Sequence, residues 1–241
     1  MAAAHEAQMP FIRNLASSDR KLRTGSLDSL KLFLSSRTSL DTQDAVKLWK
    51  GLYYALWMTD RPAPQQRLAA DLARLVYSLP RDEAKTAWFV GFWQVLSERW
   101  PHTEALRMDK FLLLVRRAFA VMLECAQKSP AVVDDVLREW PFEGTGDLRK
   151  VPLGLRLHVL DLWVDELEST KCLANEEAKD LVKKIGDLVL ELQTCPVKAV
   201  RERAKENYQD GRLPWGTKDE DMSDAEEADD DDDDEWGGIE E

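Results

Sequence analysis

KLWKGLYYALWMTDRP, residues 47–62, decides the fold, because two tryptophans and two tyrosines crowd onto about four helical turns. Its apolar side chains fall at helical spacing on two adjoining faces of the same helix. A helix that is apolar over so much of its circumference is normally buried between neighbours. We therefore predict a buried helix over residues 41–59, which Asp41 or Thr42 caps and which ends before Pro62.

The same helical period continues along most of the chain. No segment alternates as a strand would, and eight prolines fall at helix boundaries. The expected helices cover residues 10–16, 19–36, 41–59, 64–79, 82–100, 103–127, 130–140, 153–169, 175–193 and 197–208. Helix pairs that recur about every 40 residues predict an all-α, HEAT-like or armadillo-like stack of antiparallel helices. A compact orthogonal bundle is the competing architecture.

Charge divides the chain into two parts. Residues 219–241 contain fifteen acidic residues and no basic one, whereas residues 1–218 contain 33 basic and 30 acidic residues. The acidic run has too few apolar residues to offset the entropy of ordering. We expect one all-helical, repeat-like domain over residues 1–208 and a disordered acidic tail over residues 209–241. Residues 142–151 are expected to form a surface loop within that domain.

Cysteine use and hydropathy indicate the compartment. Cys125, Cys172 and Cys195 are odd in number and widely spaced, which favours reduced thiols inside the cell. The first residues carry no basic region followed by an apolar run, and no stretch of about 18 apolar residues occurs. Neither secretion nor membrane insertion is expected.

The sequence offers little for catalysis. Its three histidines lack metal-ligand spacing, and there is no phosphate-binding glycine loop. Asp161 and Asp165 share a helix face and could hold magnesium in an RNA hydrolase, but a two-metal site needs several convergent carboxylates. His158 is expected to bond to Asp161 as a structural pair. Isolated glycines are expected to permit close helix approach: Gly51, Gly91, Gly154 and Gly186. We expect no catalytic residue, no metal and no cofactor.

Two basic segments are candidate binding surfaces. One lies on the helix over residues 103–127 and the other near the N-terminus, and either could contact RNA phosphates or an acidic partner. The first segment contains Arg107, Lys110, Arg116 and Arg117, and the second contains Arg13, Arg20, Lys21 and Arg23. A solvated helix face is the alternative interpretation of the first segment. Trp215 and Trp236 lie outside the periodic body and are expected to anchor the tail in a partner's pocket.

Three stretches resemble the ribosomal RNA-processing protein 1 (Nop52-like) family. They are KLWKGLYY at 47–54 with WMTDRP at 57–62, RMDKF at 107–111 with LVRR at 114–117, and GLRLH at 154–158 leading into Asp161. The resemblance covers roughly residues 8–208. Within the motifs, these residues are expected to be structural: Trp49, Lys50, Gly51, Trp57, Asp60, Asp109, His158 and Asp161.

The resemblance implies a factor of the nucleus and nucleolus that takes part in assembly of the large ribosomal subunit (pre-60S). Such a factor supports maturation of the precursor to the large-subunit and 5.8S rRNAs. We expect a non-catalytic helical scaffold whose partners are pre-60S assembly factors, ribosomal proteins and precursor rRNA, with no membrane and no small-molecule substrate. An adaptor of an unrelated nuclear complex would suit the same fold. A metal-dependent RNA hydrolase is the remaining alternative.

Overall fold

The computed structural model describes residues 14, 15, 17, 19–129 and 131–217, and this part of the chain contains helices and no strand. The long helices are α3 (Arg20–Ser35), α4 (Thr42–Trp57), α5 (Pro62–Arg74), α6 (Asp82–Arg99), α7 (Ala105–Ala126), α8 (Leu153–Ser169), α9 (Lys179–Leu192) and α10 (Lys198–Tyr208). Short helical turns join them: η1 (Leu75–Ser78), η2 (Trp100–His102), η3 (Val133–Leu137) and η4 (Glu176–Ala178). The predicted all-α fold is confirmed.

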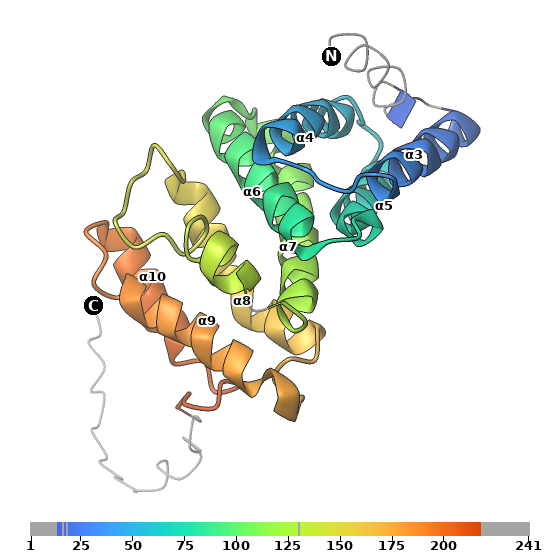
Figure 1. The fold of residues 1–241 in the computed structure, drawn as a ribbon. Coiled ribbons are helices and arrows are strands. Elements are labelled where there is room, and N and C mark those ends of the chain that lie inside the picture. Colours follow the sequence, from blue (N-terminus) through green and yellow to red (C-terminus); the bar gives the residue numbers. More distant parts are fainter. Residues whose placement is uncertain (1–13, 16, 18, 130, 218–241) are drawn as a thin grey trace, which may run out of the picture.

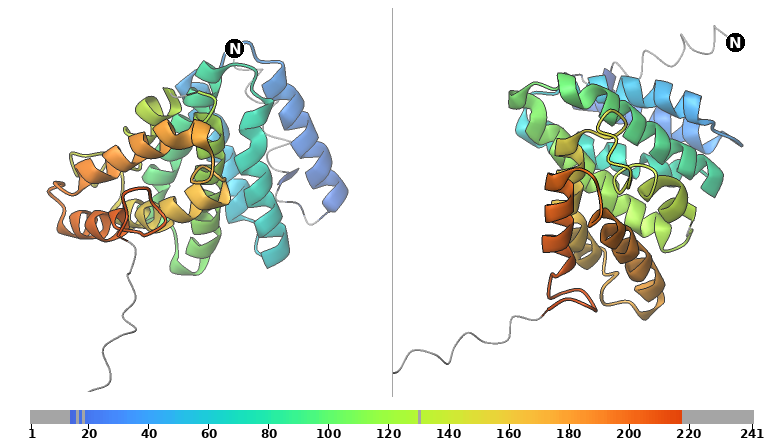
Figure 2. Two further views of the ribbon diagram at one scale, coloured as in Figure 1. Left: turned by 90° about the horizontal axis from the view of Figure 1, so that it is seen from below. Right: turned by 90° about the vertical axis from the view of Figure 1, so that its left-hand side faces the viewer.

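The helices follow one another from one end of the body to the other (Figure 1). Helix α4 packs against α6, α5 against α7, α7 against α8, and α10 against both α8 and α9. The views in Figure 2 agree that α3 and α5 lie at one end and α9 and α10 at the other. This order is consistent with the expected repeat-like stack. None of the helices in the described residues is both long and apolar enough to span a bilayer.

Helix α4 buries most of its apolar face, as predicted, but Tyr54 is 48% exposed and Trp57 is only partly buried. Asp41 caps it by accepting a hydrogen bond from the backbone N–H of Asp44 at 2.7 Å. The buried Trp49 donates from Nε1 to the carbonyl oxygen of Trp88 on α6, at 3.0 Å. The ring of Tyr53 stacks on that of Phe111 on α7, with centroids 4.4 Å apart. The aromatic residues of α4 therefore pack it against both α6 and α7.

Two glycines allow close packing, as expected. A Cβ atom on Gly91 would lie 2.8 Å from the Cβ of Ala45 and 2.9 Å from its carbonyl carbon, so α4 and α6 approach at a distance that only glycine permits. A Cβ atom on Gly186 would lie 2.3 Å from the indole of Trp215. Each glycine is thus a contact surface for a neighbouring segment.

The predicted surface loop at 142–151 contains a buried ion pair. Arg156, only 1% exposed, donates from Nη2 to Oε2 of Glu143 at 2.5 Å and to the carbonyl oxygen of Asp147 at 3.1 Å. It also donates from Nε to the carbonyl oxygen of Val151 at 3.0 Å. Burial raises the pKa of Glu143, but hydrogen bonds from Thr145 and Arg156 outweigh this and lower that pKa to about 2. One arginine thereby ties the whole loop to α8.

The region predicted as a helix over residues 130–140 is irregular. Residues 131 and 132 are helical, the π-helical segment η3 follows, and residues 138–142 form turns. The expected helix over residues 10–16 lies largely outside the described residues. Within that range the structure describes residues 14 and 15, and both are helical.

Candidate binding surfaces

The predicted basic stripe on α7 is mostly occupied by contacts within the fold. Arg107 forms an ion pair with Glu104, and its guanidinium lies 4.9 Å from the ring centroid of Trp57. Lys110 is only 5% exposed, and its Nζ donates to the carbonyl oxygens of Trp57 and Thr59 at 2.7 and 3.0 Å. Burial lowers the pKa of Lys110. Lys110 caps the C-terminal end of α4, which removes it from the candidate RNA contacts.

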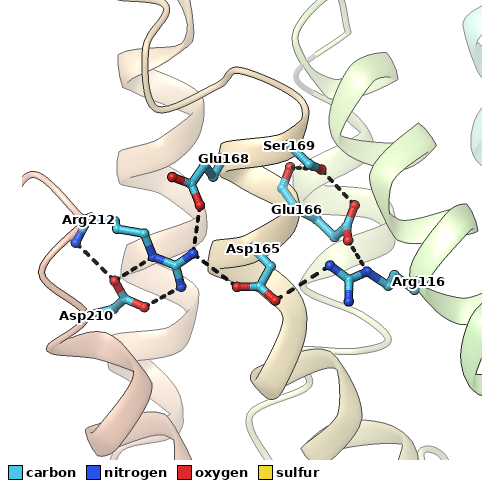
Figure 3. A network of polar contacts seen from close by, with 7 residues as sticks. All are labelled: Arg116, Asp165, Glu166, Glu168, Ser169, Asp210 and Arg212. Atoms are coloured by element: carbon cyan, nitrogen blue, oxygen red, sulfur yellow. Dashed lines mark hydrogen bonds and ion pairs between the residues drawn. The ribbon is translucent and has the colours of Figure 1, made fainter.

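Arg116 is the centre of a polar network between α7 and α8 (Figure 3). Its Nε donates to Oε1 of the buried Glu166 at 2.5 Å, and its Nη2 lies 3.6 Å from Oδ2 of Asp165. From the other side, Arg212 donates to Asp165 at 3.1 Å and to Glu168 at 2.8 Å. Asp165 therefore lies between two guanidinium groups, and Arg116 joins helices instead of facing a partner.

Arg117 is the remaining member of the stripe. It is exposed on α7 and, within the described residues, forms no ion pair. The exposed Asp109 lies on the same helix. One exposed arginine on this helix is a weak phosphate site, because affinity for RNA depends on several neutralised phosphates.

The acidic residues of α8 are also engaged. Asp161 accepts a hydrogen bond from Arg203 on α10. His158 does not bond to Asp161 as expected, because its Nε2 lies 3.1 Å from the carbonyl oxygen of Leu112 on α7, and burial lowers the pKa of His158. The described residues contain no group of three or more His, Cys, Asp or Glu side chains placed to hold a metal ion. Asp161 and Asp165 thus take part in helix packing.

Other motif positions lie around α4. Lys50 forms an ion pair with Glu98 on α6 at 3.3 Å, and the exposed Asp60 lies 3.6 Å from Nζ of Lys110. Gly51 is half-buried within α4, and Trp57 packs partly buried against Phe111.

Trp215 is anchored within this chain. Its ring stacks on Tyr208 with centroids 5.3 Å apart, and its Nε1 donates to the carbonyl oxygen of Tyr208 at 3.1 Å. The buried Leu213 shows that packing continues beyond residue 208. The expected role of Trp215 as an anchor in a partner's pocket is corrected accordingly. Trp236 lies outside the described residues.

The N-terminal basic residues surround an open cleft. Arg13 lies outside the described residues, whereas Arg20 and Lys21 are exposed in the first turn of α3. Arg23 donates from Nη1 to the carbonyl oxygen of Ser17 at 2.7 Å. Beside them, α5 contributes Arg67.

We call this feature the α3–α5 cleft; its volume is about 160 Å³. Its lining consists of Leu15, Arg20, Arg23, Thr24, Leu27, Pro64, Arg67, Leu68 and Asp71. Arg67 was missed because it lies on a different helix, and only its position on an exposed face of α5 could have signalled it. The lining thus combines three arginines with the buried Leu15, Leu27 and Leu68, and Asp71 is its acidic member.

Comparisons with known proteins agree on one family. The family model described as nucleolar protein, Nop52, matches residues 6–240. The human ribosomal RNA processing protein 1 homolog B is 29% identical over 191 residues, which cover 73% of this chain and 25% of the relative. The Drosophila melanogaster homolog is 29% identical over 174 residues (69% and 25%), and the Caenorhabditis elegans homolog is 26% identical over 189 residues (76% and 47%). The chain spans from about a quarter to about half of the length of these relatives.

Proposed function

This chain belongs to the Nop52 family of nucleolar proteins, and we propose that its helical body is a non-catalytic scaffold in assembly of the large ribosomal subunit. In this role it supports processing of the precursor to the large-subunit and 5.8S rRNAs in the nucleolus. Its partners are pre-60S assembly factors, ribosomal proteins and the precursor rRNA. The observation that carries the proposal is a family match over nearly the whole chain, together with relatives named for ribosomal RNA processing.

The structural contacts of the charged residues support a binding function for this chain rather than a catalytic one. The carboxylates that could have served a hydrolase, Asp161 and Asp165, are neutralised by arginines from other elements. The buried ions Lys110 and Arg156 stabilise a helix end and a loop. Because these polar residues pair with one another inside the fold, they fix the packing of the helices and leave contacts with partners to residues on the surface.

An exposed apolar surface supports contacts with proteins. Leu106 at the start of α7 is 97% exposed, and Met58 at the end of α4 is 66% exposed. The two helix ends adjoin, because Arg107, next to Leu106, lies over the ring of Trp57, next to Met58. These two large apolar side chains at adjoining helix ends are our candidate anchors for a protein partner.

Affinity purification tests this function. The tagged full chain is captured at moderate salt with and without ribonuclease, and the bound proteins and RNAs are identified. We expect large-subunit precursor RNA together with nucleolar assembly factors. Recovery of another nuclear complex without precursor rRNA would replace the proposal with the adaptor function.

A matched pair of variants tests the protein contacts. Leu106→Asp should reduce the ribonuclease-resistant partners, whereas Leu32→Asp, the same change at a leucine 71% exposed on α3, should not. Equal recovery with both variants would show that the ends of α4 and α7 are not the protein-binding surface.

A further inference from the structure

We propose that the α3–α5 cleft binds backbone phosphates of RNA, with Arg20, Arg23 and Arg67 as the phosphate ligands. The nature of the RNA rests on the proposed function, whereas the site itself is argued from the cleft. Arg20 and Arg23 come from α3 and Arg67 comes from α5, so folding brings together guanidinium groups that lie more than 40 residues apart.

Two of the cleft arginines, Arg20 and Arg67, differ from the arginines that join helices elsewhere in the fold. Arg116, Arg203 and Arg212 each form ion pairs with carboxylates. Within the described residues, by contrast, Arg20 and Arg67 form no ion pair, and both are exposed. An arginine whose charge is not used within the fold remains available to an external anion.

The charge of the surrounding segment favours a polyanion. Residues 19–81, which include α3, α4 and α5, contain eleven basic and six acidic residues, a net charge of +5. Residues 82–217 contain 20 basic and 23 acidic residues, a net charge of −3. The near-neutral charge of the body therefore conceals a cationic N-terminal third, and the cleft lies within it.

The positive surface extends beyond the cleft along α5. Arg74 is exposed seven residues after Arg67, which places it on the same face about 10 Å along the axis. Guanidinium groups match phosphate oxygens with two parallel hydrogen bonds, and successive arginines suit a polymer that carries a charge at each unit. Asp71 lies between Arg67 and Arg74 in the sequence of α5. Its carboxylate opposes the binding of an anion, and burial raises its pKa.

Salt-dependent binding of the purified full chain tests the site. The probe is a 20-nucleotide oligouridylate with a fluorescent 5′ end, and anisotropy is measured from low to physiological salt. Arg20→Ala/Arg67→Ala should weaken binding about tenfold or more and reduce the slope of log K against log salt by about 1.4, since each contact with single-stranded RNA contributes about 0.7. The control Arg149→Ala/Lys183→Ala removes two exposed charges from the opposite part of the body and should leave the slope nearly unchanged.

Three outcomes would overturn the site. The first is an unchanged slope in the cleft variant, and the second is an equal loss in both double variants, which indicates net charge alone. The third is displacement of the RNA by polyglutamate of equal charge, which would identify the site as one for acidic polypeptides. Circular dichroism of both variants verifies the fold. Purification of the cleft variant from cells separates the two proposals, because precursor particles held by protein contacts should still be recovered even where direct RNA binding is lost.

Discussion

Replacing Glu143 by glutamine should destabilise the fold by about 3 kcal/mol at neutral pH. The pKa of this carboxyl falls from 4.5 to about 2 in the folded chain, and such a fall corresponds to about 3 kcal/mol of favourable interaction with the ionised form. Mutations that break a buried ion pair by removing one partner cost a similar amount, about 3 to 5 kcal/mol. Glutamine keeps the shape and can still accept a hydrogen bond, so the loss reports the charge that faces Arg156.

The pH dependence provides an independent check. Because the pKa of Glu143 is lower in the folded than in the unfolded chain, its contribution is complete above the unfolded pKa near 4.5 and disappears as pH falls towards about 2. The difference in unfolding free energy between wild type and Glu143→Gln should thus be constant from pH 7 to 5 and decrease below that. Other carboxylates titrate in both proteins and cancel in the difference.

Denaturant unfolding followed by circular dichroism, repeated from pH 7 to 3, measures this difference. Glu139→Gln is the control, because Glu139 is 58% exposed in its ion pair with Lys150 and should change stability by no more than about 0.5 kcal/mol. Equal stabilities of wild type and Glu143→Gln at pH 7, or a difference that stays constant down to pH 3, would refute the role of the charge.

Three further substitutions test packing by thermal or denaturant unfolding. Lys110→Met should cost about 1 to 3 kcal/mol, because it removes the side-chain donor to the carbonyl oxygen of Trp57 and leaves that of Thr59 with Gln65 alone; no loss would show that water replaces the ammonium. Gly186→Ala should cost about 1 to 3 kcal/mol by displacing Trp215, and little in a Trp215→Ala background, so equal costs in both backgrounds would disprove the contact. Gly91→Ala should destabilise the fold by a similar amount. Its control is Gly25→Ala on α3, where the added Cβ meets no atom within 4 Å and should stabilise the helix by up to about 1 kcal/mol. Changes in unfolding free energy of the same sign in both variants would contradict the packing argument.

The helices were predictable because their signal is local. The aromatic residues of α4 fall at helical spacing, and prolines mark the boundaries, so neither feature needs knowledge of the partner helix. Trp49 could be assigned to the core for the same reason. The π-helical conformation of η3 could not be predicted, since its backbone depends on how Val133 and Leu137 pack against neighbouring helices.

The candidate site was less predictable because the partner of a charged side chain can lie far away in the sequence. Lys110 and Arg116 follow a helical spacing typical of an exposed basic face, yet they meet a helix end and a buried carboxylate more than 45 residues away. Arg67 joins Arg20 only because α5 lies beside α3. Helical spacing shows which residues share a face, but it does not show what that face contacts.

Trp215 has a consequence for the way in which the molecule meets other charged bodies. By packing on Gly186 of α9 and stacking on Tyr208, it holds the segment that follows α10 at the end of the molecule opposite α3 and α5 (Figure 2). Fifteen acidic residues follow this segment in the sequence, residues 82–217 carry a net charge of −3 and residues 19–81 carry +5, so the described part of the chain is an electric dipole whose positive pole is the end of α3 and α5. An approaching polyanion exerts a torque on such a dipole. We expect this torque to turn the end of the protein that contains α3 and α5 towards the polyanion before contact, most strongly at low ionic strength.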